Sequence, residues 1–109
     1  MTSRDLNGAV VAVVGATGGL GQAIVTSLVG RGATVVRCNR SGGPEIDLAI
    51  DIRDARSGDL LVEHVNARHG RLDGVVVAAG IVAFGDLIDT DDVVIEELFL
   101  TNAIGPMWL

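Results

Sequence analysis

The 109-residue sequence is poor in several residue types, and each shortage excludes a class of protein. A single cysteine, Cys38, leaves no internal disulfide framework. Aromatic residues make up 3% of the chain and the eight basic residues form no cluster, so nothing here would bind a nucleic acid backbone. No apolar run reaches the roughly 18 residues that span a bilayer, and residues 1–8 do not form a secretory segment. We therefore expect a cytoplasmic protein that contacts neither nucleic acid nor a membrane.

The residues that are abundant indicate one domain. Hydrophobic residues make up 49% and charged residues 20%, enough for one core in a chain too short for two. Six acids in residues 86–97 account for the net charge of −6, because the other eight of the 14 acids balance the eight basic residues. His64 and His69 are five positions apart, so they do not share a helix face as an i, i+4 metal pair would. We predict no metal site.

The apolar residues alternate between two kinds of pattern along the chain. Short β-branched runs predict strands, and apolar residues at helical spacing predict helices. The predicted strands are Ala9–Val14, Ala33–Cys38, Asp47–Ile50 and Leu72–Ala78. The predicted helices are Leu20–Val29, Ala55–His69 and Val93–Leu109. Asp89–Asp92 predict acidic caps at the start of the last helix, and Pro106 predicts a bend within it.

This order of elements predicts an α/β fold. Apolar strands separated by helices are typical of a doubly wound parallel sheet, here of about four strands and three helices. The link between the second and third strands is unusual, because only about eight residues remain at Asn39–Ile46. Parallel neighbours usually need a crossover of a dozen residues or more. We therefore predict that no helix covers this link and that the third strand is short.

A glycine-rich turn, Val14–Gly21, joins the first strand to the first helix. A bound pyrophosphate needs bare backbone amides, and a helix amino terminus supplies such donors together with a partial positive charge. A Cβ at Gly15, Gly19 or Gly21 would obstruct that approach. The turn therefore predicts dinucleotide binding, although similar turns also serve only to pack a helix against a strand.

The spacing Gly15-x-x-x-Gly19-x-Gly21 resembles the TGxxxGxG fingerprint of classical short-chain dehydrogenases/reductases, with Val14 in place of the threonine. The resemblance implies a Rossmann-like fold. It also implies that the cofactor contacts the turn at Gly15, Thr17, Gly18, Gly19, Leu20 and Gly21. The turn also fits the Gly-x-x-Gly-x-x-Gly spacing of extended relatives such as sugar-nucleotide epimerases and of atypical reductases. It leaves these branches open, and only the segment Asp73–Gly80 favours the classical one.

Two further segments resemble the same family. The segment around the fourth strand is similar to one in which an acid precedes the strand and Asn-Asn-Ala-Gly ends it, but Ala78 and Ala79 replace the asparagines. Gly80 is retained where the family's chain passes close to the cofactor. Asp51 and Ile52 match the residues that contact adenine, a carboxylate for its amino group and a backbone amide for its ring. Asp51 could instead cap the helix that follows.

The end of the second strand bears on the choice of cofactor. An acid at that point would accept hydrogen bonds from a ribose 2′-hydroxyl, whereas a 2′-phosphate needs a cation. This sequence has Asn39, Arg40 and Ser41, and the guanidinium of Arg40 suits a phosphate, with two neutral partners beside it. We therefore favour NADP(H) over NAD(H), although the glycine-rich turn contains no second basic residue.

The family's catalytic residues are mostly absent from this chain. In that family a tyrosine delivers the proton, a lysine lowers the pKa of the tyrosine, a serine orients the carbonyl and a helix asparagine completes the relay. The chain has no tyrosine, its basic residues are all arginines, and its serines precede the fourth strand. Leu98–Pro106 resembles the segment that carries the relay asparagine, so Asn102 is the one candidate catalytic residue, or else a packing asparagine.

The resemblance covers Ala9–Leu109 and ends inside the family's fourth helix. We interpret residues 1–109 as the NADP(H)-binding, amino-terminal half of an oxidoreductase that transfers hydride between nicotinamide and a carbonyl or alcohol substrate. The reacting residues would then lie on a continuation, so this chain alone is not expected to be active. The resemblance also implies a homo-oligomer. The alternatives are a non-catalytic dinucleotide- or partner-binding module and an epimerase-like or atypical relative.

Overall fold

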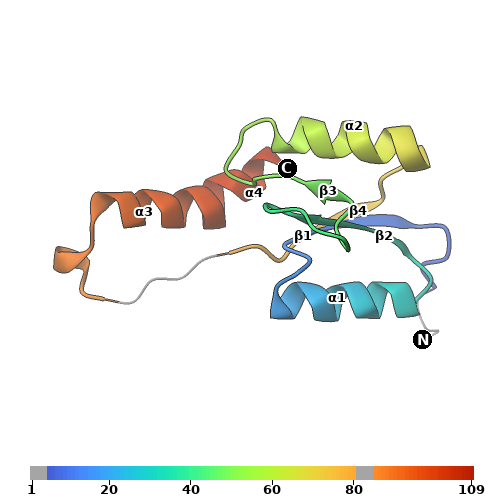
Figure 1. The fold of residues 1–109 in the computed structure, drawn as a ribbon, viewed down its shortest axis with the longest axis horizontal. Helices are drawn as coiled ribbons and strands as arrows, with labels where there is room; N and C mark the ends of the chain where they lie inside the picture. Colours follow the sequence, from blue (N-terminus) through green and yellow to red (C-terminus); the bar gives the residue numbers. More distant parts are fainter. Residues whose placement is uncertain (1–4, 81–84) are drawn as a thin grey trace.

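The computed structural model describes residues 5–80 and 85–109, and it shows an α/β arrangement (Figure 1). The elements are β1 Val10–Val14, α1 Gly19–Gly30, β2 Thr34–Asn39, β3 Leu48–Ala49, α2 Ser57–His69, β4 Gly74–Val77, a 3₁₀ turn Leu87–Asp89, α3 Asp92–Phe99, a π-helical segment Leu100–Ile104 and α4 Gly105–Trp108. All seven predicted strands and helices are present, no end differs by more than two residues from its predicted position, and the last helix is divided into three parts.

The four strands form one parallel sheet in the order β3-β2-β1-β4. β1 lies between β2 and β4, with Val10 opposite Thr34 and Val11 opposite Gly74. This order places the first βαβ unit at the centre of the sheet, so the turn after β1 opens between its two neighbours. The predicted doubly wound fold is confirmed.

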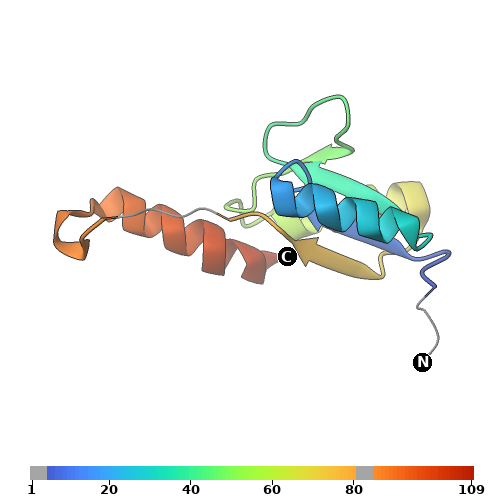
Figure 2. The same ribbon diagram turned by 90° about the horizontal axis from the view of Figure 1, so that it is seen from below.

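Two layers of apolar side chains cover the sheet, one on each face. Side chains of β1 alternate between them, and all five of its residues are buried. Leu61 and Val65 of α2 pack on one face, and Val25 of α1 packs on the other. Figures 1 and 2 show α1 and α2 on opposite sides of the sheet. Cys38 lies within the α2-side core, and burial raises the pKa of its thiol to about 12.

The link between β2 and β3 contains no helix, as the sequence predicts. β3 is only two residues long and pairs with the end of β2. Side chains hold the link in place of a helix: the Asp47 carboxylate accepts a hydrogen bond from the backbone N–H of Arg37 at 2.8 Å, and Asn39 exchanges hydrogen bonds with the backbone of Gly42. An extended connection therefore replaces the usual crossover.

The predicted last helix is interrupted by π-helical geometry rather than bent at one point. Proline has no N–H and its ring conflicts with the carbonyl four residues before it, so Pro106 disfavours ordinary α-helical bonding over the preceding turn. The N–H of Gly105 instead bonds to the carbonyl of Leu100, five residues earlier. The predicted acidic cap was wrong in detail, because Asp91 occupies the N-cap position but makes no side-chain capping bond.

A candidate nucleotide-binding site at the carboxyl ends of the strands

A cavity of about 290 Å³ opens at the carboxyl ends of the parallel strands. In open α/β sheets, ligands bind in the crevice outside these strand ends. Four chain segments and one helix line the cavity, with the residues Val14, Gly15, Gly18, Asn39, Arg40, Ile50, Asp51, Ile52, Arg53, Ala78, Ala79, Gly80, Glu97 and Thr101. The fold thus brings together segments that the sequence singled out separately.

The glycine-rich turn approaches the strand β4 too closely for side chains. Gly15 has a φ of +88°, and a Cβ on it would lie 2.6 Å from the backbone nitrogen of Ala79. A Cβ on Gly21 would collide with the carbonyl of Gly15, whereas a Cβ on Gly19 would meet nothing within 4 Å. Gly15 and Gly21 are therefore required by the protein's own packing, and Gly19 keeps the space in front of the turn open.

Three backbone amides at the start of α1 are available to a ligand. The first helical hydrogen bond of α1 runs from the N–H of Gln22 to the carbonyl of Gly18. The N–H groups of Gly19, Leu20 and Gly21 therefore have no acceptor within the helix, and Gly18 supplies no side-chain cap. The helix dipole adds partial positive charge at the same point. This arrangement fits a pyrophosphate.

The end of β2 carries the cavity's free cation. Arg40 is exposed, and within residues 5–80 and 85–109 its side chain has no hydrogen bond or ion pair. The side-chain amide of Asn39 already makes hydrogen bonds within the protein: its N–H group donates to the Thr17 hydroxyl at 3.3 Å and to the carbonyl of Gly42. Ser41 is exposed and lies outside the lining of the cavity.

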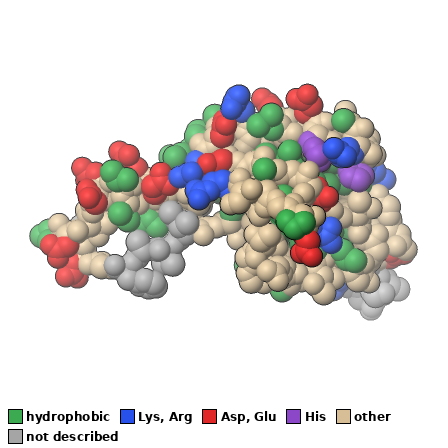
Figure 3. Space-filling view, in the orientation of Figure 1, with side chains coloured by type: hydrophobic (Ala, Val, Ile, Leu, Met, Phe, Trp, Pro, Cys, Tyr) green, Lys and Arg blue, Asp and Glu red, His purple; other side chains and the backbone are tan. Residues whose placement is uncertain are grey.

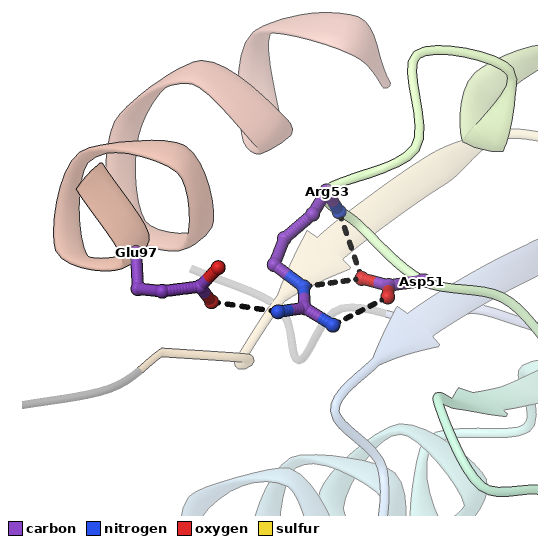
Figure 4. A network of polar contacts seen from close by, with 3 residues as sticks. All are labelled: Asp51, Arg53 and Glu97. Atoms are coloured by element: carbon purple, nitrogen blue, oxygen red, sulfur yellow. Dashed lines mark hydrogen bonds and ion pairs between the residues drawn. The ribbon is translucent and has the colours of Figure 1, made fainter. Parts of the chain in front are cut away.

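The adenine-contact candidates lie on the segment after β3. Ile52 is buried, and Asp51 is bound by Arg53, whose guanidinium also reaches Glu97 on α3 (Figure 4). Hydrogen bonds from the Arg53 side chain lower the pKa of the Asp51 carboxyl to about 2. The positive charge of Arg40 acts in the same direction, so Arg40 is near enough to influence this carboxylate. The Asp51 carboxylate is therefore ionised under ordinary conditions.

The far wall of the cavity is formed by the end of β4 and by the π-helical segment. Ala78, Ala79 and Gly80 line it, and buried Thr101 faces the same space. Asn102 lies next to Gly80: a Cβ on that glycine would be 3.3 Å from the side-chain oxygen of Asn102. The structure thus places the candidate relay asparagine beside the cavity without making it part of the lining.

Sequence reasoning missed several residues of this site. The cavity is also lined by Val14, Ile50, Arg53, Glu97 and Thr101, and the sequence singled out none of them as site residues. Arg53 follows Asp51 by two positions, a spacing that could have suggested an ion pair. Glu97 is 44 positions from Arg53, and only the fold joins them. Conversely, the predicted residues Thr17, Gly19, Leu20, Gly21, Ser41 and Asn102 do not line the cavity.

A second hollow of about 520 Å³ lies on the α1 side of the sheet, where the link between β2 and β3 carries no helix. Thr17, Arg37 and Asp47 are among its lining residues, and Thr17 is the only predicted site residue that borders it. His64 is half-buried, and its Nε2 is buried without a partner among the described residues. No group of three or more metal-ligating side chains occurs in the described part of the chain.

Comparison with known proteins identifies the family. A family model described as short chain dehydrogenase matches residues 9–109. The chain belongs to the short-chain dehydrogenase/reductase family. It is 32% identical to elsinochrome reductase 1 of Elsinoe fawcettii, an alignment that covers 99% of this chain and 46% of that protein. It is 30% identical to versicolorin reductase 1 of Aspergillus parasiticus, over 98% of this chain and 47% of that protein.

Solved structures of other dehydrogenases have the same fold. The aldohexose dehydrogenase of Thermoplasma acidophilum superposes with a TM-score of 0.85 at 24% identity, over 94% of this chain and 42% of that one. A short-chain type dehydrogenase/reductase from Mycobacterium ulcerans gives 0.84 at 24% identity, over 96% of this chain and 45% of that one. The chain therefore spans less than half the length of these relatives. Among the described residues, no helix has the length and apolar character to cross a bilayer.

Membership of the short-chain dehydrogenase/reductase family makes this chain part of an oxidoreductase family that uses a nicotinamide cofactor. The residues of the cavity fit such a cofactor. The glycines leave room for a ligand at the turn, and three backbone amides at the start of α1 are available to a pyrophosphate. Arg40, directly after β2, lines the same cavity and makes no ion pair with the described residues.

Proposed function

We propose that this chain is the NADP(H)-binding part of an oxidoreductase that transfers hydride between nicotinamide and a carbonyl or alcohol substrate. One observation supports this most strongly: a single cavity joins the glycine-rich turn, Arg40, Asp51 and the end of β4. In the proposed complex each of these would face a different part of the dinucleotide, namely the pyrophosphate, the adenosine ribose, the adenine and the nicotinamide side.

The preference for NADP(H) rests on the charge of Arg40. A guanidinium can form two parallel hydrogen bonds with a phosphate, and the Arg40 side chain makes no hydrogen bond or ion pair with the described residues. Asp51, Arg53 and Glu97 together carry one negative charge, so a 2′-phosphate depends on Arg40 for its favourable interaction. Removing this side chain should therefore affect a phosphorylated cofactor much more than an unphosphorylated one.

Each part of the cavity would contribute a separate function to the holoprotein. The amides of Gly19, Leu20 and Gly21 would bind the pyrophosphate, and Asp51 and Ile52 would bind the adenine. Asn102 would hold a water or proton carrier beside Gly80. A bound nicotinamide supplies the hydride. Residues beyond this chain would deliver the proton, because the chain contains no tyrosine and no lysine.

A homo-oligomer formed through the last helix is part of the same proposal. Val93 and Phe99, on the helix α3 that projects from the sheet (Figures 1 and 2), are 64% and 62% exposed, and Met107 on α4 is 83% exposed. Exposed apolar groups of this size favour association.

The absence of a tyrosine and a lysine from this chain also supports the alternative function, a binding module without chemistry of its own.

Fluorescence titration of the chain with NADPH and with NADH tests the proposal. NADPH should bind at least tenfold more tightly, since a hydrogen-bonded ion pair with phosphate contributes about 1.5 kcal/mol or more. The variant Arg40→Ala should bind both nucleotides about equally. Arg31→Ala, a change at an exposed arginine outside the cavity, is the matched control and should keep the preference. Failure of the unmodified chain to bind either nucleotide would refute the proposed function.

A further inference from the structure

Arg53 connects two parts of the molecule that are distant in sequence. Its backbone N–H and its Nε both donate to Oδ1 of Asp51 at 3.0 Å, and its Nη2 donates to Oδ2 at 2.8 Å. Its Nη1 donates to the Glu97 carboxylate at 2.6 Å. Figure 4 shows the guanidinium lying between the two acids. One planar group thus fixes a carboxylate on the segment after β3 and a carboxylate on α3.

The hydrogen bonds leave Asp51 with limited capacity to bind anything else. A carboxylate has about four acceptor sites, two on each oxygen. Oδ1 already accepts two N–H groups and Oδ2 accepts one. One acceptor site therefore remains, on Oδ2, and Asp51 lines the cavity. A ligand group that fills this site must be a donor, and its direction is set by how Arg53 holds the carboxylate.

We propose that Arg53 is a positioning residue for base recognition. Glu97 holds Arg53 in place, and Arg53 fixes the Asp51 carboxylate. The fixed carboxylate then favours a base with an amino group, such as adenine, over a base with a carbonyl oxygen at the same position. The proposal rests on the proposed function, since it concerns the base of the same dinucleotide. Asp51 alone would not have this effect, because an unrestrained carboxylate could rotate and accept hydrogen bonds from several directions. The contact with Glu97 also makes the base pocket depend on the position of α3.

The chain contains a natural control for this arrangement. Arg56 binds Asp54 with the same pattern, from its backbone N–H and Nε to Oδ1 and from Nη2 to Oδ2. The Arg56–Asp54 ion pair lies outside the cavity. Among the described residues, Arg56 binds no second carboxylate, whereas Arg53 binds both Asp51 and Glu97. The two arginines therefore share local geometry and differ in position, so replacing each one separates base recognition from a general effect of a lost ion pair.

The test compares NADPH with its hypoxanthine analogue, which has a carbonyl oxygen in place of the adenine amino group. By fluorescence titration, the unmodified chain should bind NADPH about tenfold more tightly than the analogue, the effect of one hydrogen bond to a charged group. Arg53→Met should reduce this ratio to about twofold, and Glu97→Gln should reduce it in the same direction. Arg56→Met and Glu96→Gln should leave it at about tenfold.

Thermal unfolding of each variant checks that the fold is intact, and Arg53→Lys provides a second variant that keeps the charge but loses the planar fork. Arg53→Lys should also lower the ratio. An unchanged ratio in both Arg53 variants, with NADPH still bound, would overturn this inference and leave the proposed function standing. Failure of the unmodified chain to bind NADPH at all would overturn the proposed function and this inference with it.

Discussion

The glycines of the glycine-rich turn have different structural roles although they are equivalent in the sequence pattern. Gly15 and Gly21 are packed against backbone, whereas Gly19 faces open space. From the pattern alone, we explained all three glycines by the close approach of a phosphate. The structure separates two effects, because a methyl group at Gly21 would disturb the protein itself and a methyl group at Gly19 would disturb only what binds there.

Replacing these glycines should therefore separate stability from binding. Gly21→Ala should lower the free energy of unfolding by about 2 kcal/mol, the usual cost of forcing extra volume into a packed site. Gly19→Ala should leave stability within about 0.5 kcal/mol and weaken NADPH binding by about tenfold or more. Urea unfolding and fluorescence titration measure the two quantities. Equal stability of the two variants would contradict the observed packing.

The ion pair of Asp51 predicts a dependence on pH. Arg53 lowers the pKa of this carboxyl from 3.8 to about 2, so the pair stabilises the folded chain above pH 3.8. That contribution is lost as the pH falls from 3.8 through about 2, because the carboxyl becomes protonated. The side chain is 34% exposed, so screening by solvent keeps the effect modest.

Carboxyl NMR titration of the chain measures this pKa directly. Arg53→Met should return the pKa of Asp51 toward its ordinary value, and Arg56→Met should not change it. In urea unfolding, the stability difference between the unmodified chain and Asp51→Asn should shrink between pH 5 and pH 2. If the pKa of Asp51 is the same with and without Arg53, the ion pair does not exist in solution.

At the scale of whole elements, the docking of α4 onto the segment after β3 holds the end of the chain beside the site. A Cβ on Gly105 would lie 2.5 Å from the carbonyl oxygen of Ile52, and a Cβ on Gly58 would collide with the carbonyl of Trp108. Two glycines therefore allow backbones to approach closely between α4 and its neighbours. This contact fixes the π-helical segment that carries Thr101 and Asn102.

A pair of helix glycines tests this docking. Gly105→Ala should lower the free energy of unfolding by about 1 to 3 kcal/mol, because the added methyl group meets two carbonyl oxygens. Gly30→Ala, at the end of α1 with nothing within 4 Å, should be neutral or should raise stability by about 0.5 to 1 kcal/mol. Thermal unfolding compares them, and a neutral Gly105→Ala would show that α4 does not dock as described.

The elements themselves could be predicted well because their patterns are local. β1 is a continuous apolar run, and the eight-residue link after β2 correctly excluded a crossover helix. The π-helical segment could not be predicted, since it arises where Pro106 and the docking of Gly105 act on the same turn. The polar network of Arg53 could not be predicted either, because a pairing across 44 positions depends on the tertiary fold.

At the scale of the whole molecule, the excess of negative charge is concentrated on one projecting part. Figure 3 shows acidic side chains gathered over α3, which is where the sequence places the excess of acids. The molecule measures 50 Å along its longest axis, and α3 extends away from the sheet (Figure 2). Val75 and Val77 of β4 are more than a third exposed, and β4 has no outer partner strand among the described residues.

The most direct measurement is a map of backbone amide shifts in the ¹⁵N-labelled chain on addition of NADPH. A cavity formed by four separated segments predicts shifts that rise together with one binding constant at Gly15–Gly21, Asn39–Ser41, Asp51–Arg53 and Ala78–Gly80. Thr26 and Ile46, in the hollow beside α1, should move little. Shifts confined to that hollow, or no shifts at saturating NADPH, would contradict a nucleotide site at the carboxyl ends of the strands.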